Sequence, residues 1–388
     1  MITTKKIAYI GSIQLADADF SYLHEAQSMA DITYFMEVCP RFMNGPALSI
    51  SKLYHKSGIF KAREIYKEFL RYDGFIDLDK IYVVNATGRF WILKSLWLHF
   101  VLLLRMIAQR YDVLHVAWPL NVYQFALYLL AKKMVLTVHD PFPHSFSDTY
   151  IVNLRRKVAF SLTRNLIILN REQKEDFIKH YHLEKKNFIE SQLCNYTLFQ
   201  VLGNGTKQFE DIPGYILAFG RICRYKGFDY LLPAMKKVHE VHPECKLVIA
   251  GKGNFHFDIS EYKSLDYIDL RNRFIPDDEM VSLVKNALFM VCPYTDATQS
   301  GVIMSSYAFY RPVVATNVGG LPEMVVDGRY GLIVKEKDID ALADAINKLL
   351  DNRDLLDTFS KNIKVDYTSG ERSWHETALK LVREYNKL

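Results

Sequence analysis

The sequence is poor in cysteine. It contains five cysteines among 388 residues, an odd number, and no two of them form a C-x-x-C pair. This spacing indicates neither a disulfide framework nor a structural zinc site. A reducing, cytoplasmic location is therefore expected. The five are Cys39, Cys194, Cys223, Cys245 and Cys292.

The chain also lacks a strong excess of charge of either sign. It has 49 Lys and Arg against 44 Asp and Glu, a formal net charge of +5. A dedicated nucleic-acid-binding protein is usually more basic than this, so no nucleic-acid partner is expected. An anionic small molecule or an anionic membrane surface is compatible with this mild charge.

Long uninterrupted apolar runs are missing as well. The apolar run at the N-terminus is too short for a secretory signal peptide. The most hydrophobic stretch, 90–107, is interrupted by Lys94, His99 and Arg105, which leaves too little continuous apolar length to span a bilayer. We expect this stretch to form a buried helix or a helix on a membrane surface.

No G-x-G-x-x-G motif follows a predicted strand, since Gly251 and Gly253 lack a third glycine; a nicotinamide-dependent enzyme is therefore disfavoured. What the chain does contain is the composition of an ordinary globular protein, with 49% apolar and 24% charged residues. Its length exceeds that of a typical single core, which predicts two domains.

Short β-rich runs alternate with longer helical patterns along the whole chain, which is typical of parallel α/β sheets. A first series of strands is predicted at 6–10, 33–38, 81–84, 113–116, 134–138 and 166–169. A second series is predicted at 215–219, 247–250, 289–292, 313–315 and 332–334. A glycine-rich polar linker at 201–214 separates them. We therefore expect an N-terminal domain at 1–205, a second domain at 206–370 and a final helical segment at 371–388.

The first candidate site follows the strand that ends at Phe219. Gly220 allows a ligand to approach the backbone, Arg221 offers a planar fork for phosphate oxygens, and Lys226 adds a point charge. Such a pair could neutralise a diphosphate without a metal. In isolation, the two cations would more simply be solvated loop residues.

Two further loops follow strands of the second domain. The first, 293–302, is small and polar and precedes a helical stretch at 303–310, so its amide groups could face an anion; alternatively Thr298 or Ser300 simply caps that helix. The second, 312–323, opens into the pair Gly319-Gly320 and ends at Glu323. A tight turn would explain it equally well.

Taken together, these segments resemble the retaining glycosyltransferases of family 4, which have the fold called GT-B. The resemblance covers residues 215–334, where G-R-x4-K-G, L-V-I-A-G-x-G and P-V-V-A-T-N-x-G-G-x-P-E occur in order. It implies two Rossmann-like α/β domains that face a central cleft, with the C-terminal helix packed back on the N-terminal domain. It also implies that Arg221 and Lys226 bind the donor diphosphate. The further donor-binding residues implied are Gly11, Gly220, Gly251, Gln299, Ser300, Gly301, Val302 and Ser305.

The chain departs from the family pattern at two acids. The family has two glutamates eight residues apart, and in an ungapped register their positions hold Ala297 and Ser305. Asp296, one residue before the first position, is our candidate replacement near the sugar hydroxyls. Ser305 or Ser306 would replace the acid that holds the ribose.

In the N-terminal domain the strand 134–138 ends in His139, and the resemblance implies that a histidine here contacts the donor sugar. His144 is a weaker candidate. A purely structural role for His139 is equally plausible. The pair Asp17 and Asp19 could be taken for a metal site, but the family does not need a metal, so no metal or cofactor is expected.

We therefore expect a metal-independent retaining glycosyltransferase with Arg221, Lys226, Asp296 and His139 as its catalytic residues. The donor is a UDP-, GDP- or ADP-sugar, and the acceptor is a saccharide or a lipid-linked molecule in surface polysaccharide or glycoconjugate synthesis. Two alternatives remain: a sugar-nucleotide epimerase of the same fold, and a non-catalytic nucleotide-sugar-binding subunit.

Contact with the inner face of a membrane is a further possibility. Basic residues accompany the apolar stretch 91–107 and could meet anionic lipid, although such charges are usually a solvated face. These residues are Lys56, Lys61, Arg63, Lys67, Arg71, Arg155, Arg156 and Lys157.

Overall fold

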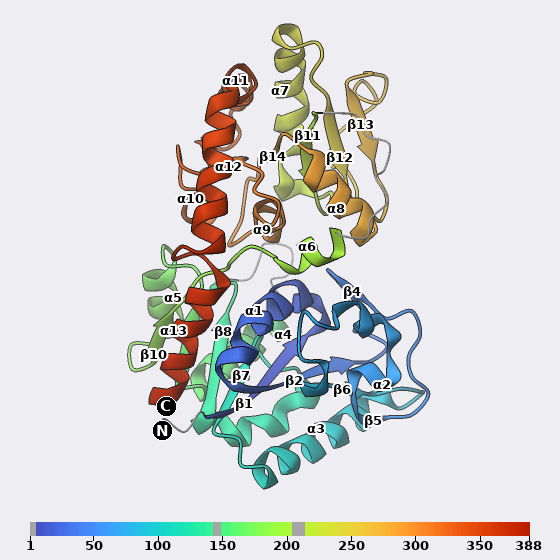
Figure 1. The fold of residues 1–388 in the computed structure, drawn as a ribbon, viewed down its shortest axis with the longest axis vertical. Coiled ribbons are helices and arrows are strands. Elements are labelled where there is room, and N and C mark those ends of the chain that lie inside the picture. The colour runs from blue at the N-terminus through green and yellow to red at the C-terminus, as the bar shows by residue number, and fades with distance from the viewer. Residues whose placement is uncertain (1–4, 143–148, 204–213) are drawn as a thin grey trace. The chain divides into compact units, whose positions relative to one another are not determined.

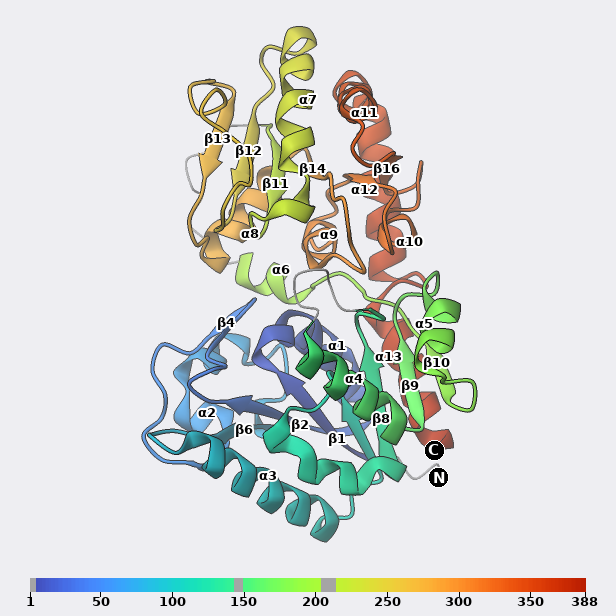
Figure 2. The same ribbon diagram turned by 180° about the vertical axis from the view of Figure 1, so that it is seen from behind.

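The computed structural model describes residues 5–142, 149–203 and 214–388. The chain forms two compact units, each described here by itself: an N-terminal unit of Met1–Leu193 with Trp374–Leu388, and a C-terminal unit of Cys194–Ser373. Figures 1 and 2 show the ribbon from opposite sides. The C-terminal unit begins earlier than the predicted boundary near 205, because the short helix α6 (Leu198–Gly203) packs against a helix of that unit.

The N-terminal unit is built on an eight-stranded sheet. Its strands follow the order β10-β9-β8-β7-β1-β2-β6-β5, and all neighbours are parallel except β5 and β6. The strands are β1 (Lys6–Ser12), β2 (Asp31–Val38), β5 (Gly58–Lys61), β6 (Ile81–Asn85), β7 (Val113–Val116), β8 (Met134–Val138), β9 (Asn165–Ile168) and β10 (Asn187–Glu190). A separate small ribbon joins β3 (Asn44–Gly45) to β4 (Leu48–Ser49).

Helices cover both faces of this sheet. Alternate strand residues such as Ile10, Val116 and Leu136 form one core with α3, η4 and α4, whereas the residues between them face α1 and α13, as strand alternation requires. The helical elements are η1 (Ile13–Leu15), α1 (Ala16–Met29), α2 (Ala62–Ile65), η2 (Lys67–Tyr72), η3 (Leu78–Lys80), α3 (Trp91–Ala108), η4 (Val122–Lys133), α4 (Tyr150–Leu162), α5 (Lys174–Tyr181) and α13 (Trp374–Lys387).

The last helix, α13, belongs to the N-terminal unit, as the resemblance implied. It buries residues at helical spacing, including Trp374, Leu381 and Tyr385, so one stripe of the helix faces the sheet. The hydroxyl of Tyr385 and Nδ1 of His115 on β7 form a hydrogen bond of 2.8 Å. The helix therefore completes the core of a unit whose other elements lie more than 180 residues earlier in the chain.

The C-terminal unit has a six-stranded, fully parallel sheet in the order β13-β12-β11-β14-β15-β16. Its strands are β11 (Ile216–Phe219), β12 (Leu247–Ala250), β13 (Ile268–Arg271), β14 (Phe289–Cys292), β15 (Val313–Thr316) and β16 (Gly331–Val334). Its remaining helices are η5 (Arg224–Lys226), α7 (Phe228–Val241), α8 (Asp277–Asn286), α9 (Gly301–Tyr307), α10 (Leu321–Val325), α11 (Ile339–Asp351) and α12 (Arg353–Thr368). The two sheets confirm the α/β fold class predicted from the alternation of strands and helices.

Helix α12 follows α11 directly and had not been predicted from the sequence. Asn352 separates the two helices and accepts a hydrogen bond from the backbone of Leu355, as an N-cap does. Among the described residues, α3 is the one helix long and apolar enough to cross a membrane by length and composition, with a mean hydropathy of 1.6. The core helix of a globular protein can pass the same test, and α3 buries one face.

Candidate functional site in the C-terminal unit

The strand order of the C-terminal unit defines where a ligand can approach. The chain runs from β11 to β12 and β13 on one side, and from β14 to β15 and β16 on the other. Loops after β11 and β14 therefore diverge, and ligands of open α/β sheets bind in the crevice at such a switch of direction. These loops are the ones that contain Gly220 to Gly227 and Pro293 to Ser300.

Glycines hold these loops against one another. Gly227 has a φ of +68°, and a Cβ there would overlap the carbonyl oxygen of Pro293. Gly319, with a φ of +50°, is close to the carbonyl oxygen of Ala297 in the same way. The backbone N–H of Thr295 also donates to the carbonyl of Tyr225 over 2.8 Å. Three motifs that are separated in the sequence therefore form one surface.

Lys226 is the cation at the centre of this surface. Its side chain is buried, and its Nζ lies 3.7 Å from the centroid of the Tyr294 ring, a cation–π contact. Among the described residues, no carboxylate lies within ion-pair distance of it. Burial, together with the nearby charge of Arg221, lowers the pKa of Lys226 to about 8. An ammonium buried without a counter-charge is costly, so this position favours an anionic ligand.

Gly220 and Val302 complete the surroundings of this ammonium. A Cβ built on Gly220 would lie 3.2 Å from Cγ2 of Val302 and 3.9 Å from Nζ of Lys226. The glycine, with a φ of +117°, therefore leaves the space in front of Lys226 open. Arg221, the next residue, is exposed. The structure thus brings together Gly220, Arg221 and Lys226 after β11 with Val302 in the first turn of α9.

The serines of the second loop are largely engaged with their own helix. Ser300 is the residue before α9, but its side chain makes no capping hydrogen bond and lies 3.3 Å from the hydroxyl of Tyr294. Ser305 donates to the carbonyl of Gly301 over 2.9 Å, and Ser306 donates to the carbonyl of Arg311 over 2.8 Å. Ser306 therefore stabilises the end of α9, whereas Ser305 keeps acceptor capacity for a ligand.

The other predicted residues of this unit lie around the same loops. Asp296 is exposed and Gln299 is half-buried, both in the loop after β14. Gly251 has a φ of +153°, and a Cβ there would overlap the carbonyl oxygen of Gly220, so its role is to let the loops after β11 and β12 approach. Gly301 packs near the hydroxyl of Tyr196. Glu323 lies in the first turn of α10.

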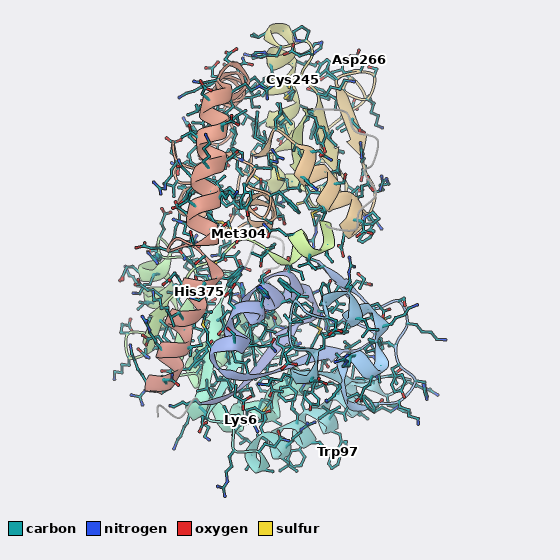
Figure 3. The ribbon with its side chains drawn as sticks, in the orientation of Figure 1. Lys6, Trp97, Cys245, Asp266, Met304 and His375 are labelled. Carbon is teal, nitrogen blue, oxygen red and sulfur yellow. The ribbon has the colours of Figure 1, made fainter. Side chains whose placement is uncertain are left out.

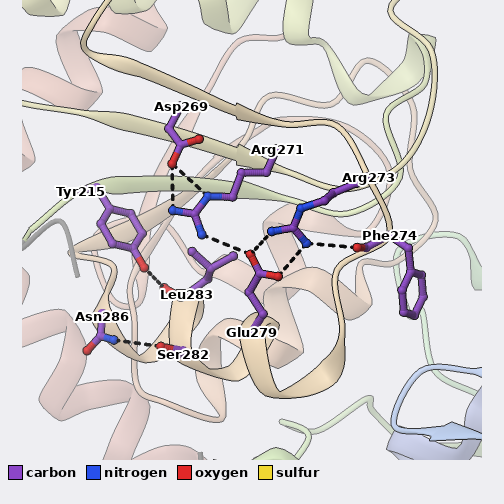
Figure 4. Close-up of polar contacts among 9 residues, drawn as sticks. All are labelled: Tyr215, Asp269, Arg271, Arg273, Phe274, Glu279, Ser282, Leu283 and Asn286. Carbon is purple, nitrogen blue, oxygen red and sulfur yellow. Dashed lines mark hydrogen bonds and ion pairs between the residues drawn. The ribbon is translucent and has the colours of Figure 1, made fainter. Parts of the chain in front are cut away.

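Two features of this unit escaped the sequence analysis. One is Tyr294, which supplies the ring in contact with Lys226; its place two residues after β14 was the available signal. The other is an ion-pair cluster, drawn in Figure 4, in which Glu279 accepts from Arg273 over 2.6 Å and from Arg271 over 3.2 Å, while Arg271 also pairs with Asp269 over 2.8 Å. These bonds hold the loop between β13 and α8.

Polar residues of the N-terminal unit

In the N-terminal unit the predicted residue Gly11 has a structural explanation. A Cβ there would overlap the hydroxyl of Tyr34 and the carboxyl of Asp19. Asp19 is buried and accepts from Tyr9 over 2.6 Å and from Tyr34 over 2.7 Å. Burial raises the pKa of Asp19 to about 7. Gly11 therefore makes room for this hydrogen-bonded group within the unit.

His139 follows β8 and lines a cavity of about 40 Å³ between the sheet and α13. The cavity has room for a few water molecules and none for a nucleotide sugar. Burial lowers the pKa of His139 to about 4, so its imidazole is neutral near pH 7. Its ring centroid lies 5.9 Å from that of Trp118. His144 lies outside the described residues.

Similarity to known proteins

Residues 213–352 match the family model described as "Glycosyl transferases group 1". The chain is 29% identical over 272 residues to the D-inositol 3-phosphate glycosyltransferase of Corynebacterium diphtheriae, which covers 63% of each protein. It is 28% identical over 210 residues to an uncharacterized glycosyltransferase of Methanocaldococcus jannaschii, covering 52% of this chain and 57% of that protein. The chain thus spans between about half and two thirds of the length of these relatives.

Solved structures resemble the whole chain. Sucrose-phosphate synthase from Thermosynechococcus elongatus has a TM-score of 0.68 at 15% identity, with 99% of this chain and 98% of that chain covered. Anabaena HepE, crystallised with UDP, has a TM-score of 0.64 at 16% identity, with 99% and 100% covered. These likenesses show the fold: the chain has the GT-B fold, with two Rossmann-like domains.

Proposed function

We propose that this protein is a retaining, metal-independent glycosyltransferase. It moves a sugar from a nucleotide diphosphate to a saccharide or lipid-linked acceptor, in surface polysaccharide or glycoconjugate synthesis on the cytoplasmic side of the membrane. The family model that matches residues 213–352 covers all three loops of the candidate site. The structural relative crystallised with UDP supports a uridine diphosphate sugar as the first donor to test, ahead of GDP- and ADP-sugars.

One observation carries this proposal: the buried ammonium of Lys226 has no carboxylate partner within residues 5–142, 149–203 and 214–388, and it lies beside Gly220 in the crevice at the edge of the sheet. A donor diphosphate is an anion of suitable chemistry for this position. Its charge would raise the pKa of Lys226 again and keep the side chain protonated. Arg221 adds a fork that can bind two phosphate oxygens.

The residues can then assist the transfer step as follows. The bond between the anomeric carbon and the diphosphate oxygen breaks, and the negative charge that develops on the diphosphate is stabilised by Arg221 and Lys226. The acceptor hydroxyl attacks the same face of the oxocarbenium-like sugar, and its proton passes to the departing diphosphate. This route needs no covalent nucleophile, and it retains the anomeric configuration.

For the sugar itself we propose a hydrogen bond to Asp296, whose exposed carboxylate can accept hydrogen bonds from sugar hydroxyls. The role of His139 stays a prediction, because the cavity that it lines has no room for a nucleotide sugar. Ser305 is our candidate for the ribose. We expect their substitution to change the preference among donor sugars more than the binding of the nucleotide.

The test compares Arg221→Ala and Lys226→Ala with the matched exposed controls Arg224→Ala and Lys252→Ala. Nucleotide release from UDP-, GDP- and ADP-sugars is measured with a pool of saccharide and lipid-linked acceptors. We expect the first two variants to lose transfer by roughly 10²–10³ each, and the controls to retain it. Near-normal transfer in both site variants would sink the assignment.

A parallel incubation with donor alone separates the alternatives. Appearance of an epimerised donor in the proton NMR spectrum, without an acceptor, would identify an epimerase instead. Thermal stabilisation by the donor without turnover on any acceptor would identify a binding subunit.

A further inference from the structure

One face of the N-terminal unit is apolar although it faces solvent. On α3 the exposed side chains Leu93, Trp97, Phe100, Leu104 and Ile107 recur every three or four residues and form a stripe along the helix. Trp97 is 63% exposed, and Figure 3 places it on the outer side of α3. A patch of this kind marks a surface that another body covers.

The stripe continues onto the two neighbouring elements. Helix α3 packs against η4, and Arg155 of α4 donates to Asn121, the residue before η4, over 2.7 Å. All three elements contribute to the same core on the same face of the sheet. We call their exposed apolar residues the outer patch. Besides the α3 stripe it comprises Ile92, Leu96, Val122, Phe125, Leu129, Tyr150, Ile151, Leu154 and Leu162.

Positive charge predominates in this region. Residues 81–171 contain eleven Lys or Arg and three Asp, and α3, η4 and α4 contain no Asp or Glu at all. Exposed cations such as Lys94, Lys132 and Lys157 lie within or at the ends of the three elements. Long basic side chains beside an apolar surface can extend to phosphate groups while their stems remain in apolar surroundings. An anionic surface is the complement of this pattern.

The inner face of α3 shows that the helix lies on the unit instead of crossing a bilayer. Leu98, Leu102 and Met106 are buried against the sheet. Ser95 donates to the carboxyl of the buried Glu37 over 2.5 Å. Insertion across a membrane would remove this face from its core and separate the Ser95–Glu37 pair.

We propose that the outer patch docks the N-terminal unit on an anionic lipid bilayer, with α3, η4 and α4 in the interfacial layer. A second copy of the chain fits the patch less well, because two such faces would bring cations against cations. This inference goes beyond the proposed function and does not depend on it, since it concerns only how the unit meets a surface.

Of the basic residues singled out in the sequence, Lys157 belongs to this region, whereas three others have partners within the unit. Lys61 pairs with Asp79 over 2.9 Å, and Arg63 lies within 4 Å of both Asp73 and Asp79. Arg156 is buried and donates to the carbonyl of Pro141 over 2.8 Å. These cations therefore stabilise the unit itself, and the apolar side chains of the outer patch are the main contact.

The test uses the full chain and sedimented vesicles of phosphatidylcholine, with and without about one third phosphatidylglycerol. We expect the protein to sediment with the anionic vesicles, less so at high salt, and poorly with the neutral ones. The triple variant Leu93→Gln, Trp97→Gln and Leu104→Gln should lose at least roughly tenfold in vesicle affinity. Lys132→Gln with Lys157→Gln should weaken binding to anionic vesicles only.

The matched control changes three equally exposed apolar residues of the other unit: Val241→Gln, Phe274→Gln and Val365→Gln. It should bind vesicles like the original protein. Circular dichroism and donor-induced thermal stabilisation verify that every variant is folded. The proposal is overturned if the original protein does not bind anionic vesicles, or if the control variant loses as much binding as the patch variant. It is also overturned if sedimentation velocity shows that the original protein is a dimer and the patch variant a monomer. Each result is independent of whether sugar transfer is found.

Discussion

The central buried polar groups of the two Rossmann-like units are satisfied in different ways. In the N-terminal unit Asp19 and His115 have partners within the protein: both oxygens of Asp19 accept from tyrosine hydroxyls, and both ring nitrogens of His115 are hydrogen-bonded, to Thr137 and Tyr385. Burial raises the pKa of Asp19 to about 7 and lowers the pKa of His115 to about 3. This interior therefore holds groups that are close to neutral.

In the C-terminal unit the central group is a cation, Lys226, with an aromatic ring beneath it and no carboxylate beside it among the described residues. Its charge is desolvated, and no carboxylate of the described part of the chain compensates it. The comparison shows that two domains of the same fold can differ in this respect. One pairs its central buried polar groups within the protein, and the other keeps a buried cation available for an anionic ligand. The second arrangement reduces folding stability in exchange for binding, a trade known at functional sites.

The chain provides a way to observe each unit separately. All four tryptophans, Trp91, Trp97, Trp118 and Trp374, belong to the N-terminal unit. Tryptophan fluorescence therefore follows unfolding of that unit, whereas far-ultraviolet circular dichroism follows both. The predictions below use this contrast.

The largest expected effect is that of Lys226→Met. We expect donor binding to weaken by roughly 10² or more, because the diphosphate loses its buried partner. Without donor, the variant should be more stable at pH 7 than the original protein. The pKa of Lys226 is lowered from 10.5 to about 8, so below pH 8 the folded state carries a charge it disfavours by about 3 kcal/mol.

The sign of this effect can be checked by pH. Between pH 8 and 10.5 the unfolded chain binds the proton that the folded chain has released, so the stability of the original protein rises with pH in this window and that of Lys226→Met lacks this rise. Circular dichroism melts with and without UDP-sugar measure both effects. Lys252→Met, at an exposed position, should change neither. If the UDP-sugar raises the melting temperature of Lys226→Met as much as that of the original protein, Lys226 is not the cation that binds the donor.

A smaller effect is expected for Asp19→Asn. Because the pKa of Asp19 is raised from 3.8 to about 7, the folded state keeps a proton that the unfolded chain releases above about pH 4. The contribution of Asp19 to the stability of the N-terminal unit therefore falls as pH rises from about 4 to about 7, by a few kcal/mol at most. The buried His99, His115 and His139, whose pKa values are lowered, contribute a slope of the opposite sign below about pH 6.5. In the asparagine variant the falling contribution of Asp19 is lost, so its stability rises more steeply with pH, or falls less, than that of the original protein.

Urea unfolding monitored by tryptophan fluorescence at several pH values measures the slope. Glu37, whose pKa burial also raises to about 7, contributes a falling slope of the same sign, which Glu37→Gln should remove. The exposed Asp73→Asn should leave the profile unchanged. An identical slope in all variants would show that Asp19 is ionised throughout.

The smallest expected effect is the difference between two glycine variants of the C-terminal unit. Gly227→Ala and Gly328→Ala both place a side chain at positive φ, +68° and +71°, but only at Gly227 would the Cβ overlap a carbonyl oxygen, whereas nothing lies within 4 Å at Gly328. We expect Gly227→Ala to cost about 1–2 kcal/mol more than Gly328→Ala. Circular dichroism should detect this loss, and tryptophan fluorescence should not.

Interior strands were predictable from the sequence, whereas three of the four edge strands of the two large sheets were not; the fourth, β16, was predicted at 332–334. The predicted bounds 113–116, 134–138, 247–250 and 289–292 equal those of β7, β8, β12 and β14, because strands buried on both faces are continuous apolar runs. The strands missed in the two large sheets are β5, β10 and β13, and each lies at a sheet edge. An edge strand faces water on one side, so charged residues such as Asp269 and Arg271 interrupt its pattern.

The candidate site divides in a similar way. Arg221, Lys226 and the loop at 299–302 could be proposed from local motifs, because glycine and charge follow strands directly. The ring of Tyr294 beneath Lys226 and the contact of Gly227 with Pro293 could not, since they join residues more than 60 positions apart. The outer patch also needed the structure: the sequence shows an apolar helix, but only packing shows which of its faces is buried.

The return of α13 to the N-terminal unit has a consequence for the order in which the protein is made. During synthesis, all residues of the C-terminal unit leave the ribosome before Trp374 to Leu388 do. The N-terminal unit is therefore incomplete until its last helix has been synthesised, and until then both His115 on β7 and Tyr22 on α1 lack their hydrogen bonds to Tyr385. The first unit to be translated is thus the last to be completed.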